Sequence, residues 1–221
     1  MKKRLLEIYR KLLAAYGAQA WWPGESPFEV IVGAILTQSV AWVNVEKAIA
    51  ALKGARLLSP DRLAQAPVET IADLIRPCLY YNEKAKKLKA FTSLLQDRYS
   101  SDLFSLFALE IPCLRQELLS VWGIGEETAD AIILYAANKP SLVIDAYTRR
   151  IFQRLGIIDE KATYAAVRTL VMTSLPADVP LYSEYHALLV RHGKTRCRRR
   201  NPACHDCPLS ALCLVSDVAV G

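Results

Sequence analysis

Apolar residues recur at helical spacing along almost the whole chain, and this pattern constrains the fold more than any other feature. Leu5 and Leu12 lie on one face of the N-terminal segment that starts the pattern. Residues 26–38, SPFEVIVGAILTQ, begin with a capping Ser26 and with Pro27 in the first turn, and their apolar run predicts a buried helix. No segment shows the sustained apolar and polar alternation that is typical of strands. The sequence therefore predicts an all-α protein.

Composition narrows the class of protein further. At 221 residues, of which 52% are hydrophobic, the chain can bury one large core or two small ones. No apolar run approaches the roughly 18 residues of a membrane-spanning helix, and the charged start, MKKRLLEIYRKLLAAYG, lacks the apolar centre of a signal peptide. We therefore expect a cytoplasmic protein with no membrane partner. The net charge of +6, with six basic residues in the segment 191–200 (RHGKTRCRRR), suits a polyanionic partner.

Four of the six cysteines fall close together near the C-terminus, with the spacing C-x6-C-x2-C-x5-C. They are Cys197, Cys204, Cys207 and Cys213. A cytosolic chain with a large core does not need disulfides, which leaves zinc or an iron–sulfur cluster. Spacers of five and six residues favour the larger object, a [4Fe–4S] cluster, although spacing alone leaves zinc open. The isolated Cys78 and Cys113 are interpreted as small buried apolar residues.

A second motif, VWGIGEETADAI at residues 121–132, places two glycines around one apolar residue directly before an amphipathic segment. Gly123 and Gly125 tolerate positive φ and leave no side chain in the way of a close approach. The free N–H groups at the start of the following helix can bind a phosphate. With a helical pattern before it, the segment predicts a helix-hairpin-helix motif, which holds duplex DNA by its phosphates. The plain alternative is a turn before an ordinary helix, whose dipole favours Glu126 and Glu127.

Asp145 follows an apolar stretch and stands directly before the helical pattern AYTRRIFQRLG. An aspartate in this position is most often only a helix N-cap. Three features point to a further role. The apolar stretch predicts partial burial, the two arginines at 149 and 150 are suited to neutralise a phosphate, and the spacing from the hairpin predicts that both line one cleft.

Together these segments resemble the endonuclease III-like branch of the helix-hairpin-helix DNA glycosylases, over nearly the whole chain. The matching landmarks are PFEVIVGAILTQ, VWGIGEETADAI, VIDAYTRRIFQRLG and the four terminal cysteines. The resemblance implies two helical domains flanking a DNA-binding cleft. Residues 26–138 would carry the helix-hairpin-helix, and residues 1–25 with 139–221 would carry the catalytic aspartate and the [4Fe–4S] loop. A monomer would bind double-stranded DNA and flip a damaged nucleotide out of the stack.

The same resemblance assigns the chemistry. Asp145 occupies the family's catalytic aspartate position, where a carboxylate stabilises the positive charge that develops on the sugar and orients water. Bifunctional members carry a lysine at the position of Glu127, and a carboxylate cannot form the Schiff base that leads to strand cleavage. We therefore expect hydrolytic base removal without lyase activity. Lys84, Lys86 and Lys87 are the alternative amines, and nothing in the sequence places them in the cleft.

A subgroup is indicated by WWP, ILTQ, a tryptophan at 42, GEETADAI and DAYT, which together resemble the 3-methyladenine DNA glycosylases. In that subgroup the positions of Trp21, Trp22 and Trp42 contact the flipped base, and Glu127 lines the same pocket, to which we also assign Pro23. Indole faces attract electron-poor rings such as alkylated purines. The plain alternative is that these tryptophans pack in the core.

Further DNA contacts are predicted from the hairpin and from the basic segments. Gln38 would fill the gap left by the flipped base, or else is a polar residue at a helix end. The other predicted contacts are Gly123, Ile124, Gly125, Thr128, Arg149, Arg196, Arg198 and Arg199. His186 is interpreted as a packing residue and His192 as a phosphate contact.

Other functions remain open at this point. One is a bifunctional endonuclease III-type glycosylase and lyase for oxidised pyrimidines, which would nick the strand. Another is a non-catalytic iron–sulfur protein that binds DNA, against which Asp145 argues. Excision of mismatched thymine or adenine is a further alternative.

Overall fold

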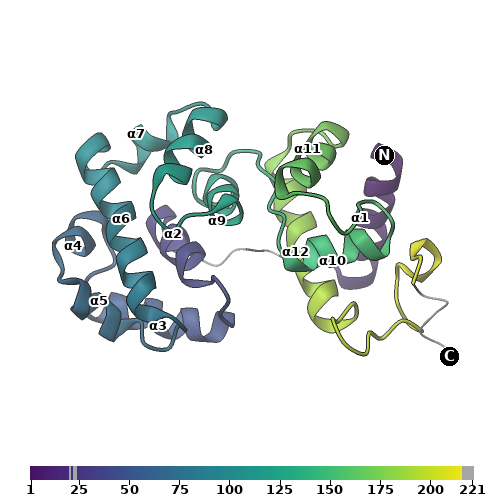
Figure 1. The fold of residues 1–221 in the computed structure, drawn as a ribbon, viewed down its shortest axis with the longest axis horizontal. Coiled ribbons are helices and arrows are strands. Elements are labelled where there is room, and N and C mark those ends of the chain that lie inside the picture. Colours follow the sequence, from purple (N-terminus) through teal and green to yellow (C-terminus); the bar gives the residue numbers. More distant parts are fainter. Residues whose placement is uncertain (20, 22–23, 216–221) are drawn as a thin grey trace. The chain divides into compact units, whose positions relative to one another are not determined.

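The computed structural model describes residues 1–19, 21 and 24–215, and its regular structure is helical throughout that part of the chain, which confirms the predicted all-α class. The chain forms two compact units (Figure 1). Unit 1 combines Met1–Trp21 with Pro140–Gly221, and unit 2 comprises Trp22–Lys139. No helix in the described ranges has both the length and the apolar character needed to cross a bilayer.

Unit 2 is built around one almost completely buried helix. Its elements are α2 (Pro27–Leu36), α3 (Trp42–Gly54), α4 (Pro60–Gln65), α5 (Val68–Leu74), α6 (Tyr81–Tyr99), α7 (Leu103–Phe107), α8 (Ile111–Ser120), α9 (Glu126–Ala131) and the π-helical turn η1 (Ile132–Ala136). Helix α2 packs against α3, α6, α9 and η1, and every residue from Phe28 to Leu36 is buried. Ser26 caps this helix by accepting a hydrogen bond from the N–H of Glu29, as the sequence predicts.

The C-terminal end of α2 is closed by a buried lysine of α6. Lys84 is only 2% exposed, and its amino group donates to the carbonyl oxygens of Leu36 (2.9 Å) and Gln38 (2.8 Å). The carbonyls at the end of a helix lack partners within it, so the lysine supplies a donor for Leu36 and for the turn that follows. Burial lowers the pKa of Lys84, and nearby Lys87 adds to that effect. The contact fixes the turn that leads from α2 to α3.

Unit 1 is organised around its longest helix. Its elements are α1 (Lys2–Tyr16), α10 (Ala146–Arg154), α11 (Tyr164–Ser174), α12 (Val179–Thr195) and the 3-10 turn η2 (Ser210–Leu212). Helices α1 and α10 both pack against α12 (Figure 1). The buried Tyr185 of α12 donates its hydroxyl to Leu5 O at 2.9 Å, and Phe152 of α10 packs edge-on against its ring. Gly193 lets α10 approach closely, because a Cβ there would lie 2.5 Å from the ring of Tyr147.

The two isolated cysteines differ in their surroundings. Cys78 is fully buried, as predicted, and its thiol lies 3.6 Å from Asn44 O. Cys113 is exposed, so the prediction that it is buried was wrong. Helix α8 buries Leu114 and Leu118, which leaves Cys113 on the solvent side of the helix.

Candidate functional site

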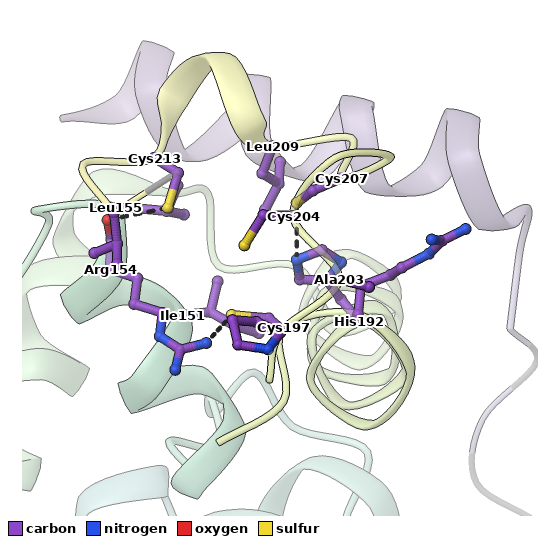
Figure 2. Close-up of a pocket in the computed structure, with 13 residues that line it drawn as sticks. Ile151, Arg154, Leu155, His192, Cys197, Ala203, Cys204, Cys207, Leu209 and Cys213 are labelled. Atoms are coloured by element: carbon purple, nitrogen blue, oxygen red, sulfur yellow. Dashed lines mark hydrogen bonds between the residues drawn. The ribbon is translucent and has the colours of Figure 1, made fainter. Parts of the chain in front are cut away.

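The four C-terminal cysteines line one pocket in unit 1 (Figure 2). The pocket encloses about 410 Å³ of empty space, part of it open to solvent, and its walls include Ile151, Leu155 and Leu209. Arg154 donates to the sulfur of Cys197 at 3.2 Å. Among the described residues, no three potential ligands are grouped closely enough to hold a single metal ion.

The chemistry of these cysteines fits a cationic group. Burial raises the pKa of the Cys207 thiol, and the charges of the neighbouring Cys197, Cys213 and Cys204 raise it further. Four thiolates around one pocket therefore need positive charge, which metal ions supply when they bind sulfur. The donor set and the apolar walls suit an iron–sulfur cluster.

His192 lies directly under the cysteine loop. It is 1% exposed, its Nδ1 is 2.8 Å from the hydroxyl of Tyr16, and its Nε2 is 3.7 Å from the sulfur of Cys207. Burial, together with the charges of Arg196 and Arg150, lowers its pKa to about 4. The interpretation of His192 as a phosphate contact was wrong, because a neutral and buried ring cannot reach DNA.

The arginines after α12 divide into two kinds. Arg196 is half-buried and lies 3.5 Å from Asp206, whereas Arg198 and Arg199 are exposed. Arg154 donates to the backbone carbonyls of these two exposed residues, at 2.9 and 3.3 Å. The loop backbone is therefore held to α10 while both charged side chains remain available to a phosphate.

Asp145 is the N-cap of α10. Its Oδ1 accepts the backbone N–H of Thr148 at 2.7 Å, and the residue is only 9% exposed, in agreement with the predicted burial. Its Oδ2 lies 3.6 Å from Nε2 of His186 on α12. Burial opposes ionisation of this carboxyl, but the hydrogen bond and charge of His186 and the N–H of Thr148 outweigh it, so its pKa is lowered. His186 is buried, as its interpretation as a packing residue predicts, and it also faces this carboxylate, which the sequence did not indicate.

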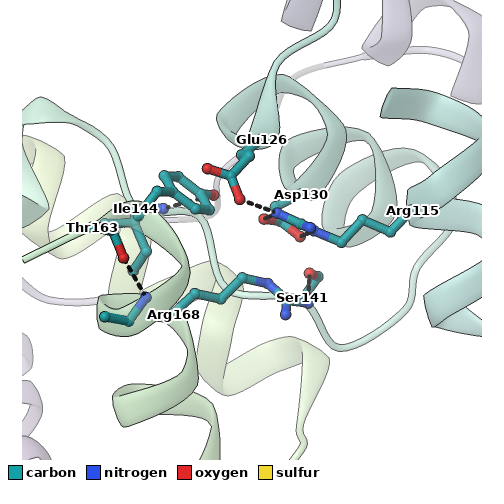
Figure 3. Close-up of polar contacts among 9 residues, drawn as sticks. Arg115, Glu126, Asp130, Ser141, Ile144, Thr163 and Arg168 are labelled. Atoms are coloured by element: carbon teal, nitrogen blue, oxygen red, sulfur yellow. Dashed lines mark hydrogen bonds and ion pairs between the residues drawn. The ribbon is translucent and has the colours of Figure 1, made fainter. Parts of the chain in front are cut away.

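The segment that leads to Asp145 is tied to α11. Arg168 donates to the hydroxyl of Ser141 at 2.9 Å, and the N–H of Ile144 lies 3.4 Å from the hydroxyl of Tyr164 (Figure 3). Arg149, a predicted phosphate contact, directs its guanidinium to Ala162 O at 2.6 Å. The backbone around the carboxylate is thus fixed on both sides.

The hairpin of unit 2 uses its two glycines differently. Gly123 has φ +84°, and a Cβ there would lie 2.4 Å from the side chain of Lys87. Gly125 has φ −93° and is the N-cap of α9, with no described atom within 4 Å of the position that its Cβ would take. The expected need for positive φ therefore holds only for Gly123, while Gly125 leaves the start of α9 open.

An ion-pair cluster joins the two helices of the hairpin. Arg115 of α8 donates to Asp130 at 3.1 Å and to Glu126 at 3.0 Å (Figure 3). Asp130 is completely buried, so this pair is shielded from solvent screening. Glu126 therefore takes part in this cluster, and Glu127 next to it is exposed in the first turn of α9.

Gln38 holds the hairpin from the side of α2. Its amide nitrogen donates to Gly123 O at 3.2 Å and to the hydroxyl of Thr128 at 2.9 Å, and its amide oxygen accepts from Lys87. Thr128 is buried and Ile124 is only 5% exposed, so neither side chain is presented to solvent at the hairpin. Sequence reasoning overlooked Trp122, which is 56% exposed directly before the first glycine. An aromatic residue beside a G-x-G turn was its signal.

The tryptophans of the expected base pocket are described in part. Trp21 is half-buried in unit 1, and the amino group of Lys194 lies 5.8 Å from the centre of its ring. Trp42 begins α3 in unit 2 and donates from its indole N–H to Glu46 at 2.9 Å. Trp22 and Pro23 lie outside the described residues.

Trp42 lines an open pocket of unit 2 with about 610 Å³ of empty space. Three carboxylates, of Glu25, Glu29 and Glu46, share this lining. Lys53 pairs with Glu25 at 2.9 Å and with Glu29 at 3.0 Å. The lining thus combines one aromatic side chain with three carboxylates and a single lysine. Such an arrangement attracts cationic rings.

Comparison with known proteins identifies the family. A family model described as "HhH-GPD superfamily base excision DNA repair protein" matches residues 32–177. The "Putative DNA repair glycosylase MJ1434" of Methanocaldococcus jannaschii is 44% identical over 95% of this chain and 96% of that protein.

Two solved structures are similar along their length. A non-covalent endonuclease III–DNA complex superimposes with a TM-score of 0.85 at 22% identity, covering 100% of this chain and 98% of that one. The H. pylori 3-methyladenine DNA glycosylase bound to 1,N6-ethenoadenine gives a TM-score of 0.73 at 27% identity, covering 87% and 95%. With the family match and the M. jannaschii relative, the conclusion is direct: this chain belongs to the HhH-GPD superfamily of base excision DNA repair proteins.

Proposed function

We propose that this DNA repair glycosylase hydrolyses the N-glycosidic bond of an alkylated purine such as 3-methyladenine in duplex DNA, and leaves the abasic strand intact. It would act as a monomer in the cytoplasm. The observation that carries the proposal is the Asp145 carboxylate, which is buried at the start of α10 yet has a lowered pKa.

The carboxylate supplies the chemistry that base removal needs. Breaking the glycosidic bond leaves positive charge on the sugar, and a buried anion stabilises that charge more strongly than an exposed one would. The N–H of Thr148 holds Oδ1 of Asp145 within the first turn of α10, whereas Oδ2 faces the imidazole of His186 across 3.6 Å. That oxygen is the one we assign to the sugar or to an attacking water.

The surroundings of the amines near the hairpin support the proposed absence of lyase activity. Glu127 stands where bifunctional enzymes have their lysine, and it cannot form a Schiff base. Lys84 donates to two carbonyls and Lys87 to the amide oxygen of Gln38. Lys86 pairs with Glu83 at 2.8 Å. Each alternative amine is therefore engaged in a contact within the fold rather than poised for attack.

The substrate class rests on the aromatic and acidic groups. Trp42 lies among three carboxylates, and the face of Trp21 already accepts the ammonium of Lys194. Each such cation–π contact contributes about 0.5–2 kcal/mol, which favours an electron-poor, alkylated ring over a neutral one. The similar H. pylori enzyme is named for 3-methyladenine, which supports the same assignment.

The four cysteines would hold a [4Fe–4S] cluster, which cross-links the loop and offsets the charge of the thiolates when bound. Arg154 would stabilise this loop through Cys197 and through the carbonyls of Arg198 and Arg199. The two exposed arginines would then contact DNA phosphates, so binding should weaken steeply with salt.

The test is a panel of duplexes that contain a methylated purine, an ethenoadenine, thymine glycol or a G·T mismatch. We expect release of the alkylated base, with strand breaks only after alkali. Preferential turnover of thymine glycol with direct nicking would instead support an endonuclease III-type enzyme. Turnover of the mismatch alone would support a thymine glycosylase.

A further inference from the structure

The two oxygens of the Asp145 carboxylate have different partners. Oδ1 accepts the N–H of Thr148 within the first turn of α10. Oδ2 faces Nε2 of His186, 3.6 Å away on α12, and both side chains are buried. The first contact is local to one helix end, whereas the second depends on the packing of α10 against α12.

The other charged groups of these elements are directed elsewhere. The guanidinium of Arg149 meets Ala162 O, and that of Arg150 meets Gly193 O and Cys197 O. On α11, Arg168 donates to Ser141 and the hydroxyl of Tyr164 meets Ile144 N–H. Within the described part of the chain, His186 is the ionisable side chain that acts on the Asp145 carboxyl.

We propose that His186 is a positioning residue that orients Oδ2 of Asp145 and keeps this carboxylate ionised for base removal. The inference rests on the catalytic role proposed for Asp145. With its proton at Nε2, the imidazole would direct a positive N–H toward Oδ2 across 3.6 Å, and this favours the anion over the neutral acid. With Oδ1 held by the helix and Oδ2 by the imidazole, the carboxylate has little freedom to rotate away from the sugar.

The direction in which removal of the imidazole should change the pKa of Asp145 can be predicted. The hydrogen bond and charge of His186 lower the pKa of Asp145, while burial acts in the opposite direction. Without His186 the burial effect remains, so the pKa rises and the acid limb of the rate profile moves to higher pH. A shift of about one pH unit would give about a tenfold loss of rate on the acid side, with a smaller loss well above the limb.

The experiment measures single-turnover base release against pH for the full-length protein and three variants. His186→Leu removes the N–H, and His186→Gln supplies an amide N–H in its place. We expect the acid limb of the rate profile to move to higher pH in His186→Leu and to return part of the way toward the wild-type position in His186→Gln. Tyr185→Phe is the matched control: it is buried on the same helix and loses the hydrogen bond to Leu5 O, so it should lower stability without moving the limb.

A second readout separates this inference from the proposed function. Because the pKa of Asp145 is lowered in the folded protein, its contribution to stability is present above the unfolded pKa and is lost as pH falls through the folded pKa. His186→Leu should therefore change acid stability in the wild-type background and much less in Asp145→Asn. Equal rate loss at every pH, or the same stability change in both backgrounds, would overturn the positioning role. Activity retained in Asp145→Asn would instead overturn the catalytic assignment.

Discussion

Helices α9 and α10 begin in opposite ways, although both start at residues that the sequence marks as functional. Helix α9 begins at Gly125, whose missing side chain leaves the first N–H groups open. Helix α10 begins at Asp145, whose own carboxylate accepts the N–H of Thr148. The same backbone donors therefore have different surroundings: in α9 no capping side chain covers them, and we propose that they meet a DNA phosphate, whereas in α10 they fix a carboxylate of the chain itself.

The largest expected effect comes from neutralising the α10 carboxylate. Asparagine caps helices about as well as aspartate, so Asp145→Asn should leave α10 intact. We expect base release to fall by about 100- to 1,000-fold, the scale seen when one electrostatic stabiliser of a transition state is lost. Single-turnover release measures the rate, and binding to the same duplex should change little. A variant that keeps its rate would show that another group performs the chemistry.

Arg115→Ala should destabilise the helix-hairpin-helix segment and leave the start of α10 unaffected. The substitution leaves the fully buried Asp130 without its guanidinium, which costs about 3 kcal/mol of unfolding free energy. Denaturant unfolding measures the loss, and Arg98→Ala is the control, since its pair with Glu117 is exposed and should be worth less than about 1 kcal/mol. Equal losses in the two variants would contradict the account of the buried pair.

The two glycines of the hairpin should respond differently to alanine. Gly123→Ala places a Cβ at φ +84° and against Lys87, so it should cost about 1–3 kcal/mol of stability. Gly125→Ala has ordinary φ and open space, so its stability cost should stay below about 1 kcal/mol. Its methyl group would nevertheless occupy the opening of α9 and weaken DNA binding. Equal stability losses in the two variants would contradict the view that Gly123 is needed for its backbone conformation and Gly125 for the open space at the start of α9.

The sequence predicts what depends on neighbouring residues. Ser26 and Pro27 mark the start of α2, and Asp145 is recognisable as the residue before α10. The spacing of the four cysteines predicts a common site, and all four line one pocket. In each case the signal is contained within a few residues of the structure that it predicts.

Contacts between distant segments are not predictable in this way. The approach of His186 to Asp145 depends on how α10 packs on α12, and the hold of Gln38 on Gly123 depends on how α2 packs beside the hairpin. Cys113 shows the same limit on a smaller scale, because the buried side of α8 is decided by which helices cover it. Local pattern gives the helices, and packing decides which side chains meet.

The central claim is that a carboxylate removes the base with water and without an amine nucleophile. Borohydride trapping tests it most directly, since reduction fixes any Schiff base between enzyme and DNA. With a duplex that contains an alkylated purine, we expect free base, an unbroken abasic strand and no covalent adduct. A borohydride-dependent adduct, lost on substitution of Lys84 or Lys87, would contradict the claim.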